Sequence, residues 1–263
     1  MASYVVTGTS TGIGLGFVKA LAANKDNKVF AIIRNPATAT DLQTFADSHP
    51  NVRIIVGEAT SKEDMDRAAE EVGKVTGGKL DALINNVGGG SVDDAKAPRD
   101  YEGNPQDLKN AILASMEPNF FSAVFTTSSF MPLIQAGEQK KIICISTGMA
   151  DDDMSLKTDI PFALGYAASK SALNTLVAKF AIDYKKDGVK FLALSPGWVK
   201  TKFGPESEMQ AGFMLQAFQK AYPELKGQIS TEDSVKMQLE VIDKLTLEDS
   251  GKFLSHHGDK YWV

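Results

Sequence analysis

The sequence has almost no cysteine and no long apolar run, and both absences narrow the class of protein. A single cysteine, Cys144, cannot form a disulfide within the chain. Every apolar run is shorter than the ~18 residues that a membrane-spanning helix needs. The first residues also lack the basic, apolar and cleavage-site succession of a secretory signal. These absences predict a cytoplasmic protein with no membrane partner.

Positive charge is also in short supply. The chain has 28 Lys and Arg residues against 33 Asp and Glu residues, which gives a formal net charge of -5. Nucleic acids are bound by a concentrated Lys and Arg surface, and no such cluster occurs in the sequence, so no nucleic-acid partner is expected. Internal repeats, low-complexity segments and proline-rich linkers are missing too. Residues 1–263 are therefore expected to form a single domain.

What is present is a regular alternation of short apolar runs and longer helix-like stretches. The runs are rich in branched residues and occupy 3–6, 29–33, 52–56, 80–84, 142–145, 189–194 and 252–254. Continuous apolar runs of this length are typical of parallel strands that are covered on both faces and connected by helices. We expect an α/β fold with a doubly wound, seven-stranded parallel sheet flanked by helices on both faces. Cys144 is then a core residue and not a nucleophile.

A glycine-rich turn follows the first apolar run and opens the first helical stretch. It reads Thr7-Gly8-Thr9-Ser10-Thr11-Gly12-Ile13-Gly14. Glycines at such a turn permit positive φ and let a pyrophosphate approach the backbone, where the N–H groups and the positive end of the helix attract the anion. The spacing Gly-x3-Gly-x-Gly differs from the more familiar Gly-x-Gly-x-x-Gly pattern. The turn alone therefore leaves tight strand-to-helix packing as an alternative.

Three further motifs follow in order, and together the four resemble the short-chain dehydrogenase/reductase family over essentially the whole chain, in particular its carbonyl and keto reductases. The three are Asn85-Asn86-Val87-Gly88 after the fourth run, Tyr166-x3-Lys170 after the fifth, and Pro196-Gly197-x-Val199-x-Thr201 after the sixth. The resemblance implies a Rossmann fold, a nicotinamide cofactor and hydride transfer to or from a carbonyl carbon. It also implies that the cofactor contacts the four motifs, namely Gly8, Thr9, Ser10, Thr11, Gly12, Ile13, Gly14, Asn86, Val87, Gly88, Tyr166, Lys170, Pro196, Gly197, Val199 and Thr201.

Tyr166 and Lys170 carry the proton chemistry that the resemblance implies. Reduction of a ketone by hydride creates an alkoxide that must be protonated. A free tyrosine with a pKa of about 10 is a poor proton donor near neutrality unless its anion is stabilised. Residues at i and i+4 share one helix face, so the Lys170 ammonium can lie beside the Tyr166 oxygen. In the family the lysine also holds the nicotinamide ribose. For this spacing taken alone, an ordinary helix-surface pair is the alternative.

The proton-transfer set of the family has two further members, and the sequence offers candidates for each. A hydroxyl residue after the fifth strand binds the substrate oxygen; here the register of the motif indicates Thr147, and the residue type indicates Ser146. Neighbouring strand residues face opposite sides of a sheet, so only one of the pair can reach the site, and Thr147 is favoured. The alternative is that both hydroxyls only close the strand end. The fourth member is an asparagine that helps hold a water relay to the lysine, and Asn119, next to Pro118, fits that place. The alternative is a polar residue that only lies next to a proline kink.

The segment after the second apolar run bears on the choice of nicotinamide cofactor. It offers Arg34 and Asn35 and no carboxylate that could bind the ribose 2′-OH of NAD. A guanidinium can pair with the 2′-phosphate of NADP through two hydrogen bonds, so Arg34 favours NADP(H) over NAD(H). Thr11 stands where many NADP-dependent members have a basic residue, and Arg34 as a solvated charge is the alternative. Glu58 is expected near the adenine, where the family more often has aspartate.

Two segments that interrupt the alternation after strand ends, 88–106 and 202–229, are expected to wall the site. The second matches the variable substrate loop of the family. Its Met and Phe residues at helical spacing suggest an apolar lid for a hydrophobic carbonyl or alcohol substrate, with packing into the core as the equal alternative. An insertion before Tyr166 contains Asp151–Asp153, which we interpret as an exposed acidic loop. His256 and His257 are interpreted as surface or interface residues, and no metal site is predicted.

These observations predict an NADPH-dependent carbonyl or keto reductase that acts on a small molecule. The alternatives are an NAD-dependent alcohol dehydrogenase and a dinucleotide-sensing protein without turnover, although a pure binder needs no proton donor. The resemblance also implies a homodimer or homotetramer formed through the helices that hold Asn119 and Tyr166.

Overall fold

The computed structural model describes residues 1–90, 95–201 and 208–263 of the chain. Their strands form one parallel sheet in the order β3-β2-β1-β4-β5-β6-β7. The strands are β1 (Ser3–Thr7), β2 (Lys28–Ile33), β3 (Val52–Val56), β4 (Ala82–Asn85), β5 (Lys141–Ile145), β6 (Lys190–Ser195) and β7 (Phe253–Ser255). The chain order reverses between β1 and β4, and open α/β sheets bind ligands at such a switch point. The predicted doubly wound, seven-stranded parallel sheet is confirmed.

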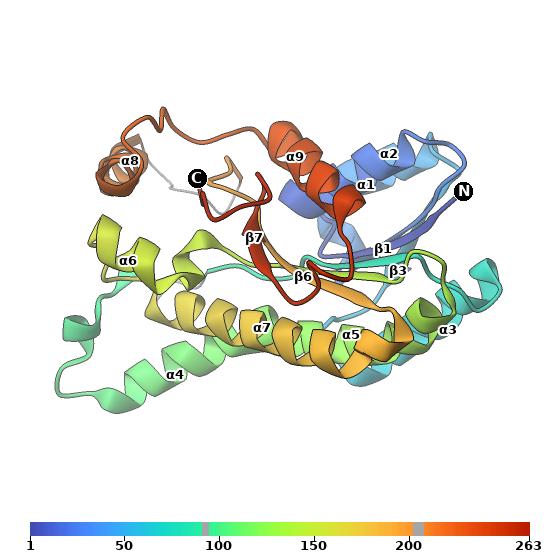
Figure 1. Ribbon diagram of the computed structural model, residues 1–263, viewed down its shortest axis with the longest axis horizontal. Helices are drawn as coiled ribbons and strands as arrows, with labels where there is room; N and C mark the ends of the chain where they lie inside the picture. The colour runs from blue at the N-terminus through green and yellow to red at the C-terminus, as the bar shows by residue number, and fades with distance from the viewer. Residues whose placement is uncertain (91–94, 202–207) are drawn as a thin grey trace.

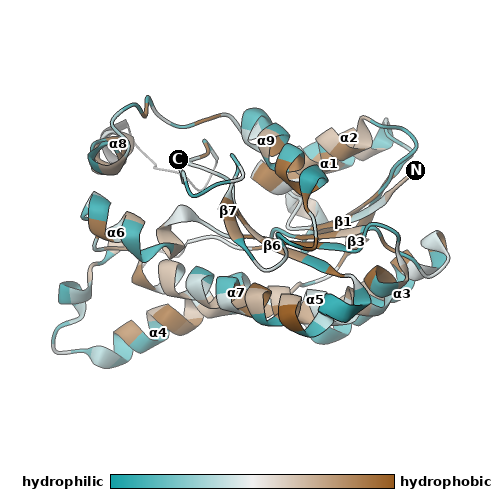
Figure 2. Cartoon of the chain, viewed as in Figure 1, coloured by the Kyte–Doolittle hydropathy of each residue, from teal (hydrophilic) through white to brown (hydrophobic). Residues whose placement is uncertain are grey.

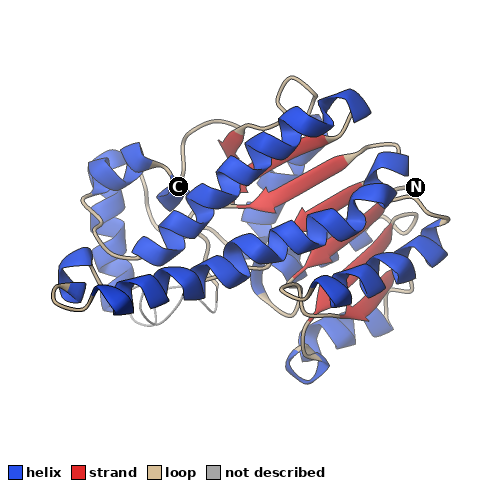
Figure 3. Cartoon of the chain, turned by 90° about the horizontal axis from the view of Figure 1, so that it is seen from below, coloured by secondary structure: helices blue, strands red, loops and turns tan. Residues whose placement is uncertain are grey.

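Helices cover both faces of the sheet (Figure 1). One face carries α1 (Gly12–Ala22), α2 (Thr40–Asp47) and α9 (Thr231–Lys244), with α1 packed on α9. The other carries α3 (Lys62–Thr76), α4 (Pro105–Met116), α5 (Ser122–Ala136) and α7 (Leu164–Asp183), with α3 packed on α5 and α4 on α7. Figure 3 shows the long helices of this second face in front of the strands. None of the helices in the described ranges is both long and apolar enough to cross a bilayer.

Two further helices lie beyond the sheet at one end of the molecule, on the left of Figure 1. They are α6 (Asp152–Thr158), which follows β5, and α8 (Glu208–Ala221), which follows β6. The two helices contact each other. The connections after β5 and β6 therefore meet outside the carboxyl ends of these strands.

The apolar strands explain why both faces are covered. Every residue of β4 and β5 is buried, as expected for central parallel strands. One apolar cluster joins the sheet to α3, α5 and α7, and a second joins it to α1 and α9. In Figure 2 the central strands carry mostly the apolar colour. Cys144 of β5 is 2% exposed, and burial raises the pKa of its thiol to about 11, so it is a core residue as predicted.

Candidate active site

The glycine turn joins the end of β1 to the start of α1, at the point where the strand order reverses. Gly8 and Gly12 adopt φ angles of +69° and +59°, a region that side chains disfavour. At Gly14 a Cβ atom would lie 2.3 Å from the Gly8 carbonyl oxygen, so only glycine fits there. Half-buried along this turn are Ser10, Thr11 and Ile13. The backbone is thus open to a close approach by a ligand.

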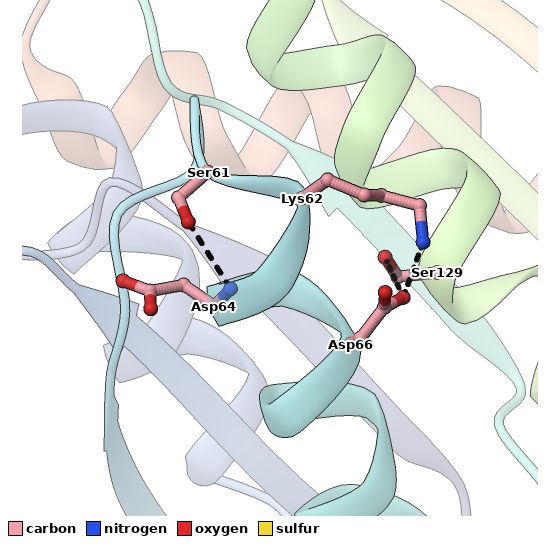
Figure 4. Close-up of polar contacts among 5 residues, drawn as sticks. All are labelled: Ser61, Lys62, Asp64, Asp66 and Ser129. Atoms are coloured by element: carbon pink, nitrogen blue, oxygen red, sulfur yellow. Dashed lines mark hydrogen bonds and ion pairs between the residues drawn. The ribbon is translucent and has the colours of Figure 1, made fainter.

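The start of α1 differs from the starts of α3 and α9 in how its backbone N–H groups are satisfied. The Ser61 hydroxyl accepts a hydrogen bond from the backbone N–H of Asp64 and so caps α3 (Figure 4). Ser230 caps α9 in the same way. At the corresponding position of α1, the Thr11 side chain makes no cap hydrogen bond. A helix start without a side-chain cap, beside glycines, is suited to an anion such as a pyrophosphate.

Asn86 and Thr7 fasten the carboxyl ends of β4 and β1 together. The Asn86 Nδ2 donates to the carbonyl oxygens of Thr7 and of the next residue, at 3.0 and 3.1 Å. The Thr7 hydroxyl accepts from the backbone N–H groups of Asn86 at 3.0 Å and Val87 at 3.2 Å. Fully buried Thr9 donates its hydroxyl to the Ile32 carbonyl oxygen of β2 at 3.2 Å. These side chains therefore shape the glycine turn from the inside of the molecule.

A widened helical turn at Glu117–Phe121 separates α4 from α5. Pro118 lies in it, and a proline inside a helix removes a backbone donor and opens the hydrogen-bond ladder. Asn119 points inward from this turn and is fully buried. Its Nδ2 donates to the carbonyl oxygens of Ser115 at 2.9 Å and Gly89 at 3.0 Å, and its Oδ1 accepts from the Gly89 N–H at 2.9 Å. Asn119 therefore fixes the loop that follows β4.

Lys170 of α7 reaches the same loop. Its Nζ donates to the carbonyl oxygen of Ile145, at the end of β5, at 2.7 Å. A Cβ atom at Gly88 would lie 2.8 Å from the Lys170 Nζ and 2.5 Å from the Asn119 Oδ1, so the Gly88 backbone lies against both groups. Lys170 is 3% exposed, and burial lowers the pKa of its amine to about 8 because the ammonium loses hydration.

Tyr166 is half-buried one turn before Lys170 on α7, and the two residues share a helix face. Gly165 lets the first turn of α7 come close to α4, because a Cβ atom there would lie 2.9 Å from the Ala111 carbonyl oxygen. The same helix contacts the widened turn that holds Asn119. The fold therefore brings Tyr166, Lys170 and Asn119 to one place.

The two hydroxyl residues after β5 are used differently. Ser146 is 2% exposed, and its hydroxyl donates to the Oδ1 of Asn174 on α7 at 2.7 Å. Thr147 is half-buried, and its Oγ1 accepts from the backbone N–H of Met149 at 3.3 Å. The Ser146 proton is thus engaged by Asn174, whereas the Thr147 hydroxyl keeps its proton for donation.

Arg34 and Asn35 follow β2, and Glu58 follows β3. The Arg34 side chain is 80% exposed, with its Nη1 3.5 Å from the Glu58 Oε2. Such an exposed pair is weak and screened by salt, so the guanidinium can exchange Glu58 for another anion. The Asn35 Oδ1 accepts from the Ala37 N–H at 3.0 Å and caps a short helical turn. The exposed Arg34 guanidinium can therefore bind another anion, whereas the Asn35 side chain is engaged in its own turn.

The turn after β6 packs against His256. The Pro196 carbonyl oxygen accepts from the Ser234 hydroxyl of α9 at 2.7 Å. Gly197 has a φ of +84°, and a Cβ atom there would lie 2.6 Å from the His256 Cε1. His256 is 2% exposed, and burial lowers its pKa to about 4. The prediction of a surface or interface position is therefore wrong for His256. Strand β7 pairs with β6, and this pairing brings His256, the residue after β7, against Gly197. His257 is exposed, as predicted.

The segment that contains Val199 and Thr201 runs back toward the glycine turn. Val199 pairs with Ile229 in a parallel bridge. A Cβ atom at Gly12 would lie 3.9 Å from the Thr201 Cγ2, so Thr201 lies near the start of α1. Of the predicted substrate loop at 202–229, residues 202–207 lie outside the described residues, and α8 forms much of the remainder. Phe218 of α8 is 3% exposed, which matches the core-packing alternative for this residue.

The insertion before Tyr166 forms helix α6, where an exposed acidic loop was expected. Asp151 caps this helix by accepting from the Met154 N–H at 2.9 Å, and Asp152 and Asp153 are exposed in its first turn. Acidic residues at this position interact favourably with the helix dipole. Within the described part of the chain, no cluster of three or more His, Cys, Asp or Glu residues is arranged to hold a metal ion.

Sequence comparisons give the same family over most of the chain. Residues 3–211 match the family model described as short chain dehydrogenase. The chain is 39% identical over 268 residues to "Short-chain dehydrogenase/reductase atnB" of Arthrinium sp, with 100% of both chains covered. It is 38% identical over 272 residues to "Short chain dehydrogenase virK" of Hypocrea virens, again with 100% of both covered.

Solved structures with the same fold include two carbonyl reductases. The NADPH-bound carbonyl reductase from chicken fatty liver is similar with a TM-score of 0.80 and 30% identity over 98% of each chain. The carbonyl reductase Sniffer of D. melanogaster gives a TM-score of 0.79 and 23% identity over 98% of each chain, a likeness of fold alone. Together with the family match and the full-length relatives, the motifs at the switch point show that this chain belongs to the short-chain dehydrogenase/reductase family.

Proposed function

We propose that this protein is an NADP(H)-dependent carbonyl reductase, which reduces a ketone or aldehyde to an alcohol. The observation that carries the proposal is the buried Lys170 amine, one turn from Tyr166 and held at the end of β5 by the Ile145 carbonyl oxygen. A buried amine beside a tyrosine at the switch point suits proton transfer. The likeness to the NADPH-bound carbonyl reductase from chicken supports this reading.

The residues around the switch point fit a dinucleotide. The start of α1, which no side chain caps, would hold the pyrophosphate together with the backbone of the glycine turn. Arg34 would pair with the 2′-phosphate that distinguishes NADP from NAD. Gly197 would border the nicotinamide, and Lys170 would hold its ribose. When bound, the cofactor supplies or accepts the hydride.

The proton is moved by the chain's own residues in this proposal. Tyr166 donates its phenolic proton to the substrate oxygen, and Lys170 stabilises the anion that remains. Thr147 donates a hydrogen bond to the same oxygen and so orients it. Ser146 is assigned no such role, because its proton is engaged by Asn174. Asn119 acts indirectly by holding the loop that lies against Lys170.

Replacement of Tyr166 by Phe tests the proposal, because it removes the hydroxyl and keeps the ring. The rate of NADPH oxidation with a carbonyl substrate, followed by absorbance, should fall by about 10²–10⁴-fold, the usual contribution of a positioned acid or base. NADPH binding, measured by fluorescence titration, should change little. Tyr184→Phe, at the far end of α7, is the matched control and should keep the wild-type rate.

Two outcomes would contradict the proposal. A Tyr166→Phe variant that retains most of the wild-type rate would show that another group donates the proton. Tight NADPH binding by the wild-type protein without turnover of any ketone, aldehyde or quinone would favour a dinucleotide-sensing protein instead.

A further inference from the structure

A third apolar cluster lies outside the two clusters that cover the sheet. Its buried members are Met154 of α6, Phe218 of α8, Trp262 and Val263. The partly buried residues that pack against it are Ile160, Trp198, Met214, Tyr222, Leu225 and Phe253. In Figure 1, α6, α8 and the C-terminal residues lie at the same end of the molecule. The cluster thus joins three segments that are far apart in the sequence.

Within this cluster, Trp262 contacts both β7 and the residue that follows α8. It is 3% exposed, and its ring stacks on Phe253 of β7 with centroids 4.3 Å apart and an interplanar angle of 17°. Its backbone N–H donates to the hydroxyl of Tyr222, just after α8. The preceding residue, Tyr261, packs edge-on against the Tyr222 ring with centroids 4.8 Å apart. Both backbone and ring therefore fix the place of Trp262.

Trp262 also packs directly on the turn that follows the candidate catalytic hydroxyl. A Cβ atom at Gly148 would lie 2.5 Å from the Trp262 Cβ and 2.7 Å from the Met154 Sδ, so Trp262 and Met154 fill the space beside Gly148. Thr147 belongs to the same turn, because its carbonyl oxygen accepts from the Ala150 N–H at 3.0 Å. The cluster therefore lies directly beside the turn that presents Thr147.

At its other side the cluster reaches the turn after β6. Trp198, the residue after Gly197, packs edge-on against Phe218 of α8 with centroids 5.2 Å apart. The cluster consequently contacts Gly148, which follows Thr147, at one side and includes Trp198, which follows Gly197, at the other. These two positions border the place where the proposed function puts the carbonyl carbon and the nicotinamide.

We propose that Trp262 is a specificity-determining residue that acts through its neighbours: it holds the cluster together, and the partly buried side chains of this cluster form the wall for the apolar part of a carbonyl substrate. This inference rests on the proposed function, which places carbonyl reduction between Thr147 and Gly197. A ketone with an aryl group gains burial against such a wall. A small dicarbonyl has no large apolar group to bury there and gains little from the wall.

The test compares 4-phenyl-2-butanone with butane-2,3-dione as substrates of the Trp262→Ala variant. The variant should lose about 10-fold or more in kcat/KM for the aryl ketone and less than about 3-fold for the small diketone, as expected for lost apolar contact. The KM for NADPH should stay within about 2-fold of the wild-type value, since the cofactor residues are untouched. Trp262→Phe keeps a ring on Phe253 and should restore most of the selectivity.

Tyr184→Ala is the matched control, because Tyr184 packs on Phe180 and Phe191 in another apolar cluster. It should lower the midpoint of thermal unfolding and leave the ratio of the two kcat/KM values unchanged. The inference would be overturned if Trp262→Ala lost kcat/KM equally for both ketones. It would also be overturned if Tyr184→Ala changed the ratio of the two kcat/KM values as much as Trp262→Ala does.

If the wild-type protein reduces neither ketone, the proposed function fails on these substrates and binding decides the inference. Calorimetric titration of 4-phenyl-2-butanone into the NADP⁺-bound protein should then show affinity about 10-fold weaker in Trp262→Ala and unchanged in Tyr184→Ala. Equal affinity in all three proteins, or no binding to the wild-type protein, would overturn it.

Discussion

Lys170 shows how burial tunes a single side chain. A lysine in water keeps its proton until about pH 10.4, whereas burial lowers the pKa of the Lys170 amine to about 8. Near neutral pH the group is still charged, and it can stabilise the anion of Tyr166. Its hydrogen bond to the Ile145 carbonyl oxygen orients the amine and does not neutralise it. The charge is thus kept where the proposed chemistry needs it, in spite of its desolvation.

The lowered pKa predicts that the stability difference between the wild-type protein and Lys170→Met depends on pH. From pH 8 toward 10.5, the unfolded chain holds more protons at Lys170 than the folded protein does, so wild-type stability rises with pH in this window. Methionine has no proton to lose. The free energy of unfolding of the wild-type protein should therefore gain ~2 kcal/mol on that of the variant as the pH goes from about 7 to about 10.

Urea unfolding of the two ligand-free proteins at a series of pH values measures this difference. A difference that stays constant across the window would show that the Lys170 amine titrates as an ordinary lysine.

Local spacing predicts some site residues and not others. Tyr166 beside Lys170 follows from the i, i+4 relation within one helix, and the sequence is sufficient for it. The engagement of Ser146 depends on Asn174, which comes from a different element. The burial of His256 depends on which strand lies beside β6, and nothing in the residues around it indicates this. Such contacts between distant segments have no short-range signature.

At the scale of elements, the starts of the helices differ in what satisfies their N–H groups. Serine hydroxyls cap α3 and α9, whereas α1 starts after Thr11 without a side-chain cap. Figure 4 also shows Asp66 of α3 accepting from Lys62 and from Ser129 of α5, so α3 is held along its first turns. We infer that the sequence stabilises α3 by itself and leaves the start of α1 for a phosphate.

Paired substitutions at the two helix starts test this difference. Ser61→Ala removes a cap and should lower the free energy of unfolding by about 1 kcal/mol. Thr11→Ala removes no cap hydrogen bond and should lower it by no more than a few tenths of a kcal/mol, roughly the effect of an ordinary surface change. Urea unfolding without ligand compares the two. A loss in Thr11→Ala as large as that in Ser61→Ala would contradict an uncapped start of α1.

The sequence predicts those strands and helices whose apolar run or helical periodicity is long enough to be recognised. The central strands fall within a residue or two of the predicted runs. The sequence does not predict the helix at 152–158, because its Asp-rich start resembles a loop and its buried apolar residue, Met154, belongs to the same cluster as distant Trp262. Short helices held by tertiary contacts lack the periodicity that identifies longer ones.

For the whole molecule, the order of the strands gathers the four motifs at one edge of the sheet. β1, β4, β5 and β6 are neighbours, and their carboxyl ends carry the glycine turn, the loop at Gly88, Thr147 and the turn at Gly197. Parallel pairing explains why motifs spread over most of the sequence meet at one place. The third apolar cluster, with α6, α8 and Trp262, lies beyond the same edge of the sheet.

The proposed reduction of carbonyl compounds with NADPH requires a preference for that cofactor, which a comparison of rates measures. NADPH and NADH oxidation by the wild-type protein and Arg34→Ala are measured across a panel of ketones, aldehydes and quinones. We expect turnover of apolar carbonyl compounds with kcat/KM at least about 10-fold higher for NADPH than for NADH, and a smaller preference in Arg34→Ala, where the charged partner of the 2′-phosphate is gone. Faster turnover with NADH, or no NADPH oxidation with any member of the panel, would contradict this expectation.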